Sequence, residues 1–467
     1  MVPLSTKSYS YAGSMWLAAS FVTALWWLAA FAVTPVAADE APVASDRFAV
    51  GVATCDVTPE APLPLWGYGA LHAALAREAL DPLKAKAIVI HAGGEKLAIV
   101  GVDLGRGPTT AMMETIRAEL KEKAGIEHVL IGGSHTHHGP VIELTDRPGF
   151  GRGKFDAAVE YSRRLPGLLI DAILAADKTA QPAKLGTATK SINYNRNRHS
   201  KREPKATEPT LSVLRFDDEQ GRPLAVLVNF AAHPTMVSPT VVKYSADYPA
   251  ALRKKIESEL ATHCVFMQGA AGDMSPNPPP APATSDGEPP PNHVAFGAAL
   301  ADEALTLARA IETKKPQHPG IRGKVDHFRF ASRVNFSSPL VRASYSVAFF
   351  PELVANYVEE FGAGITPELN TILLNREIAI VGCSGELFAN HSNRLKERSY
   401  LPCTLFFGYC NGHHMYFPTI EAASEGGYGA DPTVAPAEIG AGERMMNQAL
   451  MNIYTLQGKF PMAEAED

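Results

Sequence analysis

Short runs of apolar residues alternate with helical patterns along most of the chain. Residues 87–91 and 97–102 predict two strands around a Gly-Gly turn, and residues 111–123 predict an amphipathic helix that Gly125 ends. Further strands are predicted at 128–131, 224–230, 265–268 and 378–382, and further helices at 168–176 and 294–311. Strands that are apolar throughout and alternate with helices predict an α/β fold. We expect one large domain with a mixed, partly parallel β-sheet core flanked by helices.

The N-terminal segment has the pattern of a signal peptide. Residues 15–33 carry no charge, Lys7 precedes them, and Val-Ala-Ala ends at Ala38. Small residues at the first and third positions before a cut suit signal peptidase, so we expect cleavage of residues 1–38 and export to the periplasm, the cell envelope or the medium. The alternative is an uncleaved membrane anchor, because the apolar run is long for a signal peptide. The mature domain would then be residues 39–467.

The composition excludes some classes of function. With 43 Lys and Arg against 49 Asp and Glu, the net charge of -6 does not suit a protein that binds nucleic acid through its phosphates. The five cysteines form no CxxC pair, and their odd, sparse distribution does not suit a disulfide framework. We expect them to pack in the core, with a bridge between Cys403 and Cys410 as the alternative in an oxidising compartment.

A proline-rich segment interrupts the alternation of strands and helices. Residues 276–292 contain eight prolines and cannot continue a helix or a sheet. A linker between domains would have this composition. The segment is short, however, and candidate functional residues lie on both sides of it, so we expect a surface loop within one domain.

Polar side chains follow four of the predicted strands, at the point where each strand ends. These polar segments are GGSHTHHGP (132–140), AAHPT (231–235), GAAGDMSPN (269–277) and CSGE (383–386). In α/β proteins the carboxyl ends of strands meet at one crevice, where ligands bind. Two imidazoles and a carboxylate there would form the usual protein ligand set of a catalytic zinc ion, with a position left for water. The sequence therefore indicates an exported α/β zinc hydrolase.

Each of these residues also has an ordinary structural explanation. A single histidine such as His233 after a strand is more often a hydrogen-bonded core residue than a ligand. The H-x-H pattern occurs on exposed turns, and a lone Glu386 would be a solvated carboxylate. Asp103 could cap a helix or a turn. The pair His413 and His414 could lie on a loop without a chemical role.

Taken in order, these segments resemble the neutral/alkaline (non-lysosomal) ceramidase family. SHTHHGP is similar to the family pattern S/T-H-T-H-S-G-P, FAAHPT to F-A-x-H-P-T, and GDMSPN to G-D-V-S-P-N. Weaker similarities are GVATCDVTPE, WGYGA, YNRN and NGHHMYFPTIEAASEGGY. The resemblance extends over residues 50–440. It corresponds to the catalytic N-terminal domain, whereas members usually carry a further immunoglobulin-like C-terminal domain that we do not expect after residue 440.

The resemblance implies one zinc ion per chain, held by two histidines, a glutamate and a tyrosine. Carried over to this sequence, the ligands are His135, His233, Glu386 and Tyr416. A phenolate is an uncommon zinc ligand, and its negative charge would add to that of the carboxylate in neutralising the ion.

The same resemblance implies catalytic roles for four further residues. His137 resembles the general base and acid of the family, and Arg196 of YNRN resembles the arginine that binds the developing oxyanion. Ser275 is either a nucleophile or a group that holds the substrate head group by hydrogen bonds. Tyr428 is expected to be a second phenol that lines the site.

The implied reaction is hydrolysis of the amide bond of N-acylsphingosine to sphingosine and a fatty acid. The implied partner is a lipid or N-acyl amide substrate, together with peripheral contact with a lipid surface. Amide hydrolysis is the part of this prediction that does not depend on the C-terminal domain. The alternatives are a zinc hydrolase for another N-acyl amide or an ester, and a secreted binding protein without activity. No nucleotide-binding motif is present.

Overall fold

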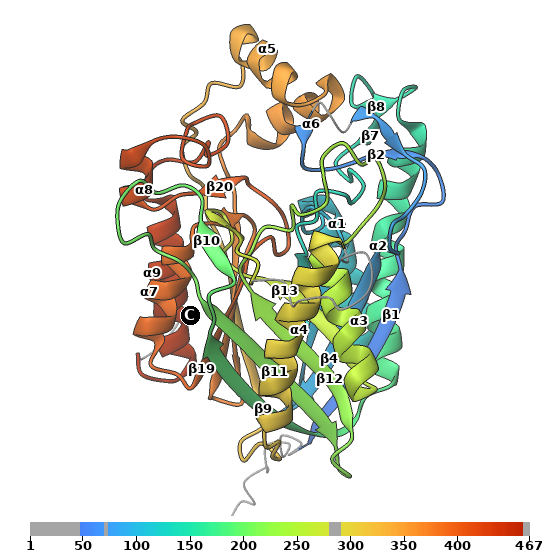
Figure 1. Ribbon diagram of the computed structural model, residues 1–467, viewed down its shortest axis with the longest axis vertical. Coiled ribbons are helices and arrows are strands. Elements are labelled where there is room, and N and C mark those ends of the chain that lie inside the picture. Colours follow the sequence, from blue (N-terminus) through green and yellow to red (C-terminus); the bar gives the residue numbers. More distant parts are fainter. Residues whose placement is uncertain (1–46, 70–72, 280–290, 461–467) are drawn as a thin grey trace, which may run out of the picture. The chain divides into compact units, whose positions relative to one another are not determined.

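The computed structural model describes residues 47–69, 73–279 and 291–460 (Figure 1). The expected signal peptide (1–38) and most of the proline-rich segment (276–292) lie outside these residues. Within the described part of the chain, no helix combines the length and the apolar character needed to cross a bilayer.

The larger of two main sheets contains eight strands in the spatial order β13-β12-β11-β9-β1-β4-β5-β6. The strands are β1 (Phe48–Asp56), β4 (Lys84–Ala92), β5 (Glu95–Val102), β6 (His128–Gly133), β9 (Gln181–Ser191), β11 (Thr210–Asp218), β12 (Pro223–Phe230) and β13 (His263–Gln268). The outermost pair at each edge, β5 with β6 and β12 with β13, is parallel, and the pairs between them are antiparallel. The prediction of a mixed, partly parallel sheet is therefore confirmed.

A second sheet of four strands has the order β15-β16-β17-β19. Its strands are β15 (Ile321–His327), β16 (Glu368–Leu374), β17 (Ile378–Cys383) and β19 (Cys403–Phe407), with β17 and β19 parallel. Four short ladders lie outside the main sheets: β2 (Leu63–Pro64) with β3 (Leu75–Ala76), β7 (Thr145–Pro148) with β8 (Gly151–Arg152), β10 (Asn195–Asn197) with β14 (Met274–Pro276), and β18 (Glu386–Leu387) with β20 (Tyr416–Phe417).

The helices are α1 (Thr110–Ala124), α2 (Asp156–Lys178), α3 (Tyr248–Leu260), α4 (Asn292–Ala310), α5 (Pro339–Ala348), α6 (Pro351–Phe361), α7 (Ala389–Ser399), α8 (Ile420–Glu425) and α9 (Ala441–Leu456). Gly125 ends α1 in the left-handed conformation, as predicted. Helix α2 begins well before the predicted start at residue 168 and continues through Pro166. Proline lacks one backbone donor, but Val159 and Leu165 lie on the same buried face as Ile173, so packing along the whole helix outweighs that loss.

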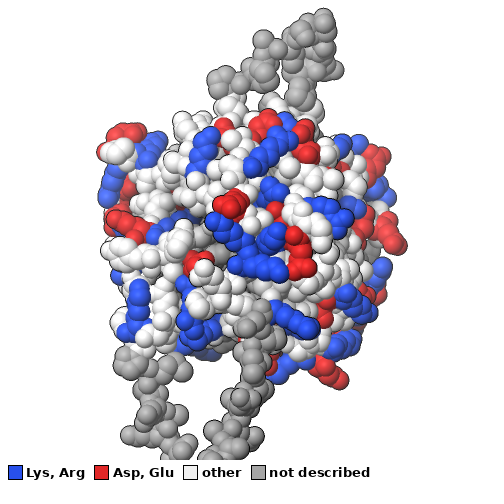
Figure 2. All heavy atoms as spheres, turned by 90° about the horizontal axis from the view of Figure 1, so that it is seen from below, with Lys and Arg blue, Asp and Glu red and all other residues white. Residues whose placement is uncertain are grey.

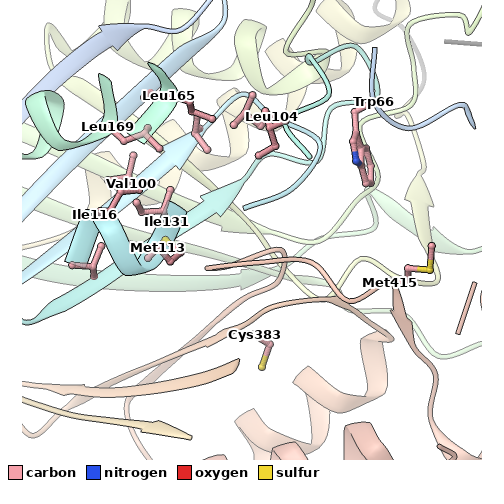
Figure 3. Packing of buried hydrophobic residues seen from close by; sticks show 14 of the residues in the cluster. Trp66, Val100, Leu104, Met113, Ile116, Ile131, Leu165, Leu169, Cys383 and Met415 are labelled. Atoms are coloured by element: carbon pink, nitrogen blue, oxygen red, sulfur yellow. The ribbon is translucent and has the colours of Figure 1, made fainter. Parts of the chain in front are cut away.

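Alternate residues of the strands are buried in different layers, which explains why these strands are apolar throughout. In β4, Ala87 and Val89 face the layer of α1 and α2, whereas Ile88 and Ile90 face the second sheet. The outer face of β11 to β13 is covered by α3 and α4. Figure 3 shows Leu165 and Leu169 of α2 and Met113 and Ile116 of α1 directed toward Val100 and Ile131 of the large sheet. The sheets therefore lie face to face between outer helices, and each fully buried aliphatic side chain contributes about 1.5–3 kcal/mol.

The charged surface and the cysteines agree with what the composition predicted. Figure 2 shows positive and negative side chains interspersed over the face seen from below. The five cysteines are free, and four of them are buried. Packing in the core is therefore confirmed for these four thiols, and the alternative of a bridge between Cys403 and Cys410 is not observed.

A partly buried histidine outside the candidate site predicts how stability depends on pH. His263 at the start of β13 lies beside Thr54, and burial, with Lys86 and Arg253 nearby, lowers its pKa to about 3. Between the unfolded value of 6.5 and about 3, the unfolded chain binds a proton that the folded protein does not, so the free energy of unfolding falls as the pH falls. We expect His263→Asn to reduce this slope by about 1.4 kcal/mol per pH unit in urea unfolding.

The matched control is the exposed His318, whose replacement by Asn should leave the slope unchanged. An unchanged slope in His263→Asn itself would contradict the prediction.

Candidate metal centre

Two buried histidines follow strands of the large sheet and present the same ring nitrogen to one point. His135 follows β6 in a left-handed conformation (φ 66°), and its Nδ1 lies 2.7 Å from the carbonyl oxygen of Gly105. His233 follows β12, and its Nδ1 lies 2.6 Å from the carbonyl oxygen of Ala271. A carbonyl only accepts, so Nδ1 carries the proton in both rings and the lone pair of each ring is on Nε2. The strained backbone of His135 is held by its N–H, which donates to Leu104.

A carboxylate and a phenol approach the same point from the other sheet. Glu386 follows β17, and the parallel pairing of β18 with β20 places it opposite Tyr416. Oε2 of Glu386 lies 3.3 Å from Nε2 of His135 and 3.2 Å from Nε2 of His233. The Tyr416 hydroxyl lies 3.4 Å from Nε2 of His233. The structure therefore brings together the four residues predicted as ligands.

These distances fit a metal ion. Ligand atoms about 2.0–2.2 Å from a tetrahedral zinc ion lie roughly 3.3–3.6 Å from one another, close to the separations of 3.2–3.4 Å found here. Nitrogen and oxygen donors also suit zinc chemically. A nitrogen of His137 lies within 4.8 Å of one nitrogen of His135 and one of His233 as well. The residues present thus fit a zinc ion bound by nitrogen and oxygen.

The protonation states also suit metal binding. Burial, with a smaller effect from the positive charge of Arg198, lowers the pKa of His233 to about 3, so its ring is neutral near pH 7. Burial would raise the pKa of Glu386, but the imidazoles around it outweigh that effect and hold it well below its usual value. Burial and the charge of Glu386 raise the pKa of Tyr416 well above its usual value. A cation is therefore required to make Tyr416 a phenolate.

His137 lies between the cluster and an apolar pocket. Its Nε2 is 3.4 Å from Nε2 of His135, and its ring contacts the edges of Trp66 and Tyr68. Unlike the histidines behind it, His137 is only half-buried, and it lines the pocket. Burial and the neighbouring histidines lower its pKa well below the usual value, so the ring is neutral and able to accept a proton.

The position of His137 depends on Gly67. Gly67 has a φ of 113°, and a Cβ there would lie 2.4 Å from Cγ of the His137 ring. We expect Gly67→Ala to displace the imidazole and to lower kcat by about 10²-fold, within the usual contribution of a general base, while metal content is retained. Gly94→Ala is the control, because Gly94 also has a positive φ but has no atom near the new Cβ. Equal kcat values for the two variants would contradict the prediction.

The arginine of the site is not the one predicted. Arg196 is exposed on β10, because Asn195 and Asn197 on either side of it point into the protein and side chains alternate along a strand. The structure therefore does not bring Arg196 to the cluster. Arg198 follows the strand, and its Nη2 lies 2.9 Å from Nε2 of His233 and 3.0 Å from the Tyr416 hydroxyl, to which it donates.

The other two predicted catalytic residues, Ser275 and Tyr428, lie in different surroundings. Ser275 is half-buried on β14, opposite Arg196, and within the described residues its hydroxyl makes no hydrogen bond to a side chain that could act as a base. Tyr428 is 65% exposed, and its ring contacts that of Tyr416 at 5.8 Å and lies below the guanidinium of Arg198. The structure thus places Tyr428 at the rim of the cluster.

An apolar pocket leads from the surface to the cluster. Its walls include Trp66, His137, Glu386, Tyr416 and Tyr428. The region of α5 and α6 contributes four further wall residues: Phe349, Phe350, Leu353 and Tyr357. Both helices (orange in Figure 1) lie above the ends of the strands that carry the cluster. The polar cluster is therefore the end of a largely apolar cavity.

Three residues that contact the cluster were not predicted as site residues from the sequence. Trp66 contacts the rings of His135, His137 and His413 edge to face. The hydroxyl of Tyr409 lies 3.4 Å from Oε2 of Glu386, and His413 lies 3.1 Å from Oε1. The pair His413 and His414 was visible in the sequence, but only the fold brings His413 to Glu386.

Comparison with known proteins identifies the family. The family model described as neutral/alkaline non-lysosomal ceramidase, N-terminal, matches residues 48–292, slightly more than half of the chain. The chain belongs to this ceramidase family. The matched part contains His135, His137 and His233, whereas Glu386 and Tyr416 follow it and are brought to the same point by the fold. The sequence resemblance to the ceramidase family is thereby confirmed.

Individual ceramidases are more distantly similar. Neutral ceramidases B and A of Dictyostelium discoideum are 30% and 28% identical over 190 and 191 residues, 35% of this chain in each case. The matched part spans only 25–26% of the length of these relatives. The neutral ceramidase of Pseudomonas aeruginosa has a similar fold (TM-score 0.67, 19% identity, 89% of this chain and 75% of that one). A ceramidase complexed with C2 is similar too (TM-score 0.68, 18% identity, 90% and 77%).

Proposed function

We propose that this protein is a zinc-dependent hydrolase that cleaves the amide bond of N-acylsphingosine to give sphingosine and a fatty acid. The observation that carries the proposal is the convergence of His135, His233, Glu386 and Tyr416 at the end of an apolar pocket. Membership of the ceramidase family supports it, as do relatives named as neutral ceramidases.

The four converging residues would hold the zinc ion, and the remaining ones would bind and protonate the substrate. Bound zinc supplies a Lewis acid for the amide carbonyl and lowers the pKa of a water molecule. The carbonyls of Gly105 and Ala271 orient the two ligand histidines before any substrate arrives. The apolar walls of the pocket bind the acyl chain and exclude water from the cluster.

His137 moves the protons of the reaction. Water attacks the amide carbon, a C–O bond forms, and Nε2 of His137 accepts the proton that the water loses. As the C–N bond breaks, the same imidazole returns this proton to the leaving amine. The products are a carboxylic acid and an amine, so atoms and charge balance. The low pKa of His137 leaves it without a positive charge before the reaction, as a proton acceptor must be.

Arg198 takes the role that the sequence assigned to Arg196. Its half-buried guanidinium lies beside Tyr416 and His233, where a fixed positive charge stabilises the oxyanion that develops on the amide oxygen. Tyr428 at the rim is available to hydrogen-bond the substrate. Ser275 is assigned to the head group rather than to nucleophilic attack, because the described residues offer its hydroxyl no base.

We also propose that the protein is exported and acts at a lipid surface. The apolar run in residues 15–33 and Ala38 support cleavage of a signal peptide. The pocket lined by Phe349, Phe350 and Leu353 supports a substrate that leaves a lipid phase.

The test is release of fatty acid from detergent-dispersed N-acylsphingosine by the purified 39–467 chain, with a chelator and then with added zinc. Release that is lost on chelation and restored by zinc supports the proposal. Faster turnover of short, water-soluble amides or esters would replace the substrate assignment but keep the hydrolase. A folded, zinc-loaded protein that cleaves none of these would be a binding protein.

A further inference from the structure

The pair His413 and His414 has no role in the reaction described so far, yet one of its rings contacts a predicted metal ligand. His413 is 2% exposed, and its Nε2 lies 3.1 Å from Oε1 of Glu386. The other oxygen of this carboxylate, Oε2, faces His135 and His233. The two oxygens of Glu386 therefore have different partners.

The chemistry of this contact fixes the direction of the hydrogen bond. An ionised carboxylate only accepts, so His413 donates through Nε2–H and its Nδ1 is left with a lone pair. Nδ1 is buried and has no hydrogen-bond partner within the described residues. A buried polar atom without a partner is unfavourable. Among the described residues, the contact with Glu386 is the polar interaction that offsets the burial of this ring.

The loop that carries His413 is held in an unusual conformation. Tyr409, Asn411 and Met415 have φ values of 56–60°, a region that side chains other than glycine rarely adopt. The Asn411 side chain bonds the backbone of Val129 and Ile131 in β6. The surrounding contacts thus overcome a locally unfavourable backbone.

The neighbours of the ring leave it little freedom to turn. On the far side of His413, the backbone N–H of His414 donates to the carbonyl of Ser384. The Trp66 ring packs edge to face on His413 with 5.1 Å between centroids. The backbone is therefore held on both sides of His413, and the Trp66 ring packs against the imidazole itself.

We propose that His413 is a positioning residue for Glu386: its Nε2–H holds Oε1, so that Oε2 alone is presented to the metal. A carboxylate held in this way binds as a single-atom ligand and is already oriented before the ion arrives. Without the donor, Glu386 can turn and bring both oxygens to the ion. The inference rests on the proposed zinc site and concerns how that site is assembled.

The test measures metal binding rather than turnover, using the chain 39–467. The zinc dissociation constant is obtained by competition with a chromophoric chelator for the parent chain, His413→Ala and His413→Gln. We expect His413→Ala to bind zinc about 10–100-fold more weakly, the usual effect of losing a partner of a metal ligand. His413→Gln keeps an N–H at a similar reach and should bind within about threefold of the parent.

Cobalt(II) provides a second measurement that a purely structural role would not change. The intensity of its visible bands falls when the coordination number rises, so release of Oε1 in His413→Ala should weaken these bands. The control is His414→Gln, because His414 is equally buried but bonds Ser384 rather than Glu386. This control should match the parent in both zinc affinity and cobalt spectrum.

The outcomes test the positioning role of His413 and the proposed zinc site separately. If His413→Ala is folded and matches His414→Gln in affinity and spectrum, the positioning role is overturned while the zinc site stands. If both histidine variants weaken zinc binding equally, the effect is structural and the positioning role is again overturned. Failure of the parent chain itself to bind zinc or cobalt would overturn the proposed metal site and, with it, this inference.

Discussion

Replacing His233 with alanine is expected to remove bound zinc and hydrolytic activity together. The imidazole is completely buried, its Nδ1 is fixed by Ala271, and its Nε2 lies 3.2 Å from Glu386. Loss of one of four ligands opens the site to water, and loss of the Lewis acid costs several kcal/mol, so activity should fall by roughly 10³-fold or more. Zinc content by atomic emission and fatty-acid release measure the two effects on the same sample, and His135→Ala should behave alike.

The control for the ligand variants is His137→Ala. His137 belongs to the same motif but lines the pocket, and we assign it to proton transfer. It should lose about 10²–10⁴-fold in kcat while keeping its zinc. Loss of zinc from His137→Ala to the same extent as from His233→Ala would show that His137 is a ligand.

The second large effect is expected at Arg198. Its guanidinium lies 3.0 Å from the Tyr416 hydroxyl and close to His233, whereas Arg196 is exposed on the other side of β10. Removing one group that stabilises an oxyanion lowers kcat by about 10²–10³-fold. We therefore expect this loss in Arg198→Ala and a change within about twofold in Arg196→Ala, since surface substitutions rarely matter.

The two arginine variants form a matched pair because they remove the same side chain from positions two residues apart. Steady-state kinetics on one dispersed substrate compares them directly, and zinc content shows whether the metal site is intact. Equal activity of the two variants, or a larger loss in Arg196→Ala, would contradict the reassignment. A loss of zinc in Arg198→Ala would mean that the guanidinium supports the ligands instead of the oxyanion.

The fold was predictable where local pattern and burial agree. The pair β4 and β5, helix α1 with its end at Gly125, and the parallel edge strands have clear sequence signals. The division of the strands between two sheets was not predictable, because a strand buried on both faces has the same composition whether a helix or a second sheet covers it. Helix α2 was predicted too short because Pro166 and Gly167 resemble a helix start.

Some residues of the candidate site were likewise predictable from the sequence, and others were not. Strand ends in the sequence indicated His135, His233 and Glu386 by a general rule of α/β folds, and the family resemblance added Tyr416. Arg198 could not be distinguished from Arg196, because both lie in one polar segment and only the direction of β10 separates them. The contact of His413 with Glu386 depends on the path of a loop stabilised by distant residues, which no local pattern records.

The four proposed ligands come from both halves of the protein core. His135 and His233 extend from the eight-stranded sheet, while Glu386 and Tyr416 follow strands of the four-stranded sheet. An ion held by all four would act as a cross-link between chain segments that are far apart in sequence, comparable to a bridge that closes a long loop. Binding would then favour the folded state in proportion to the logarithm of free zinc concentration. The supply of zinc in the surroundings would thus affect the stability of the fold as well as the activity.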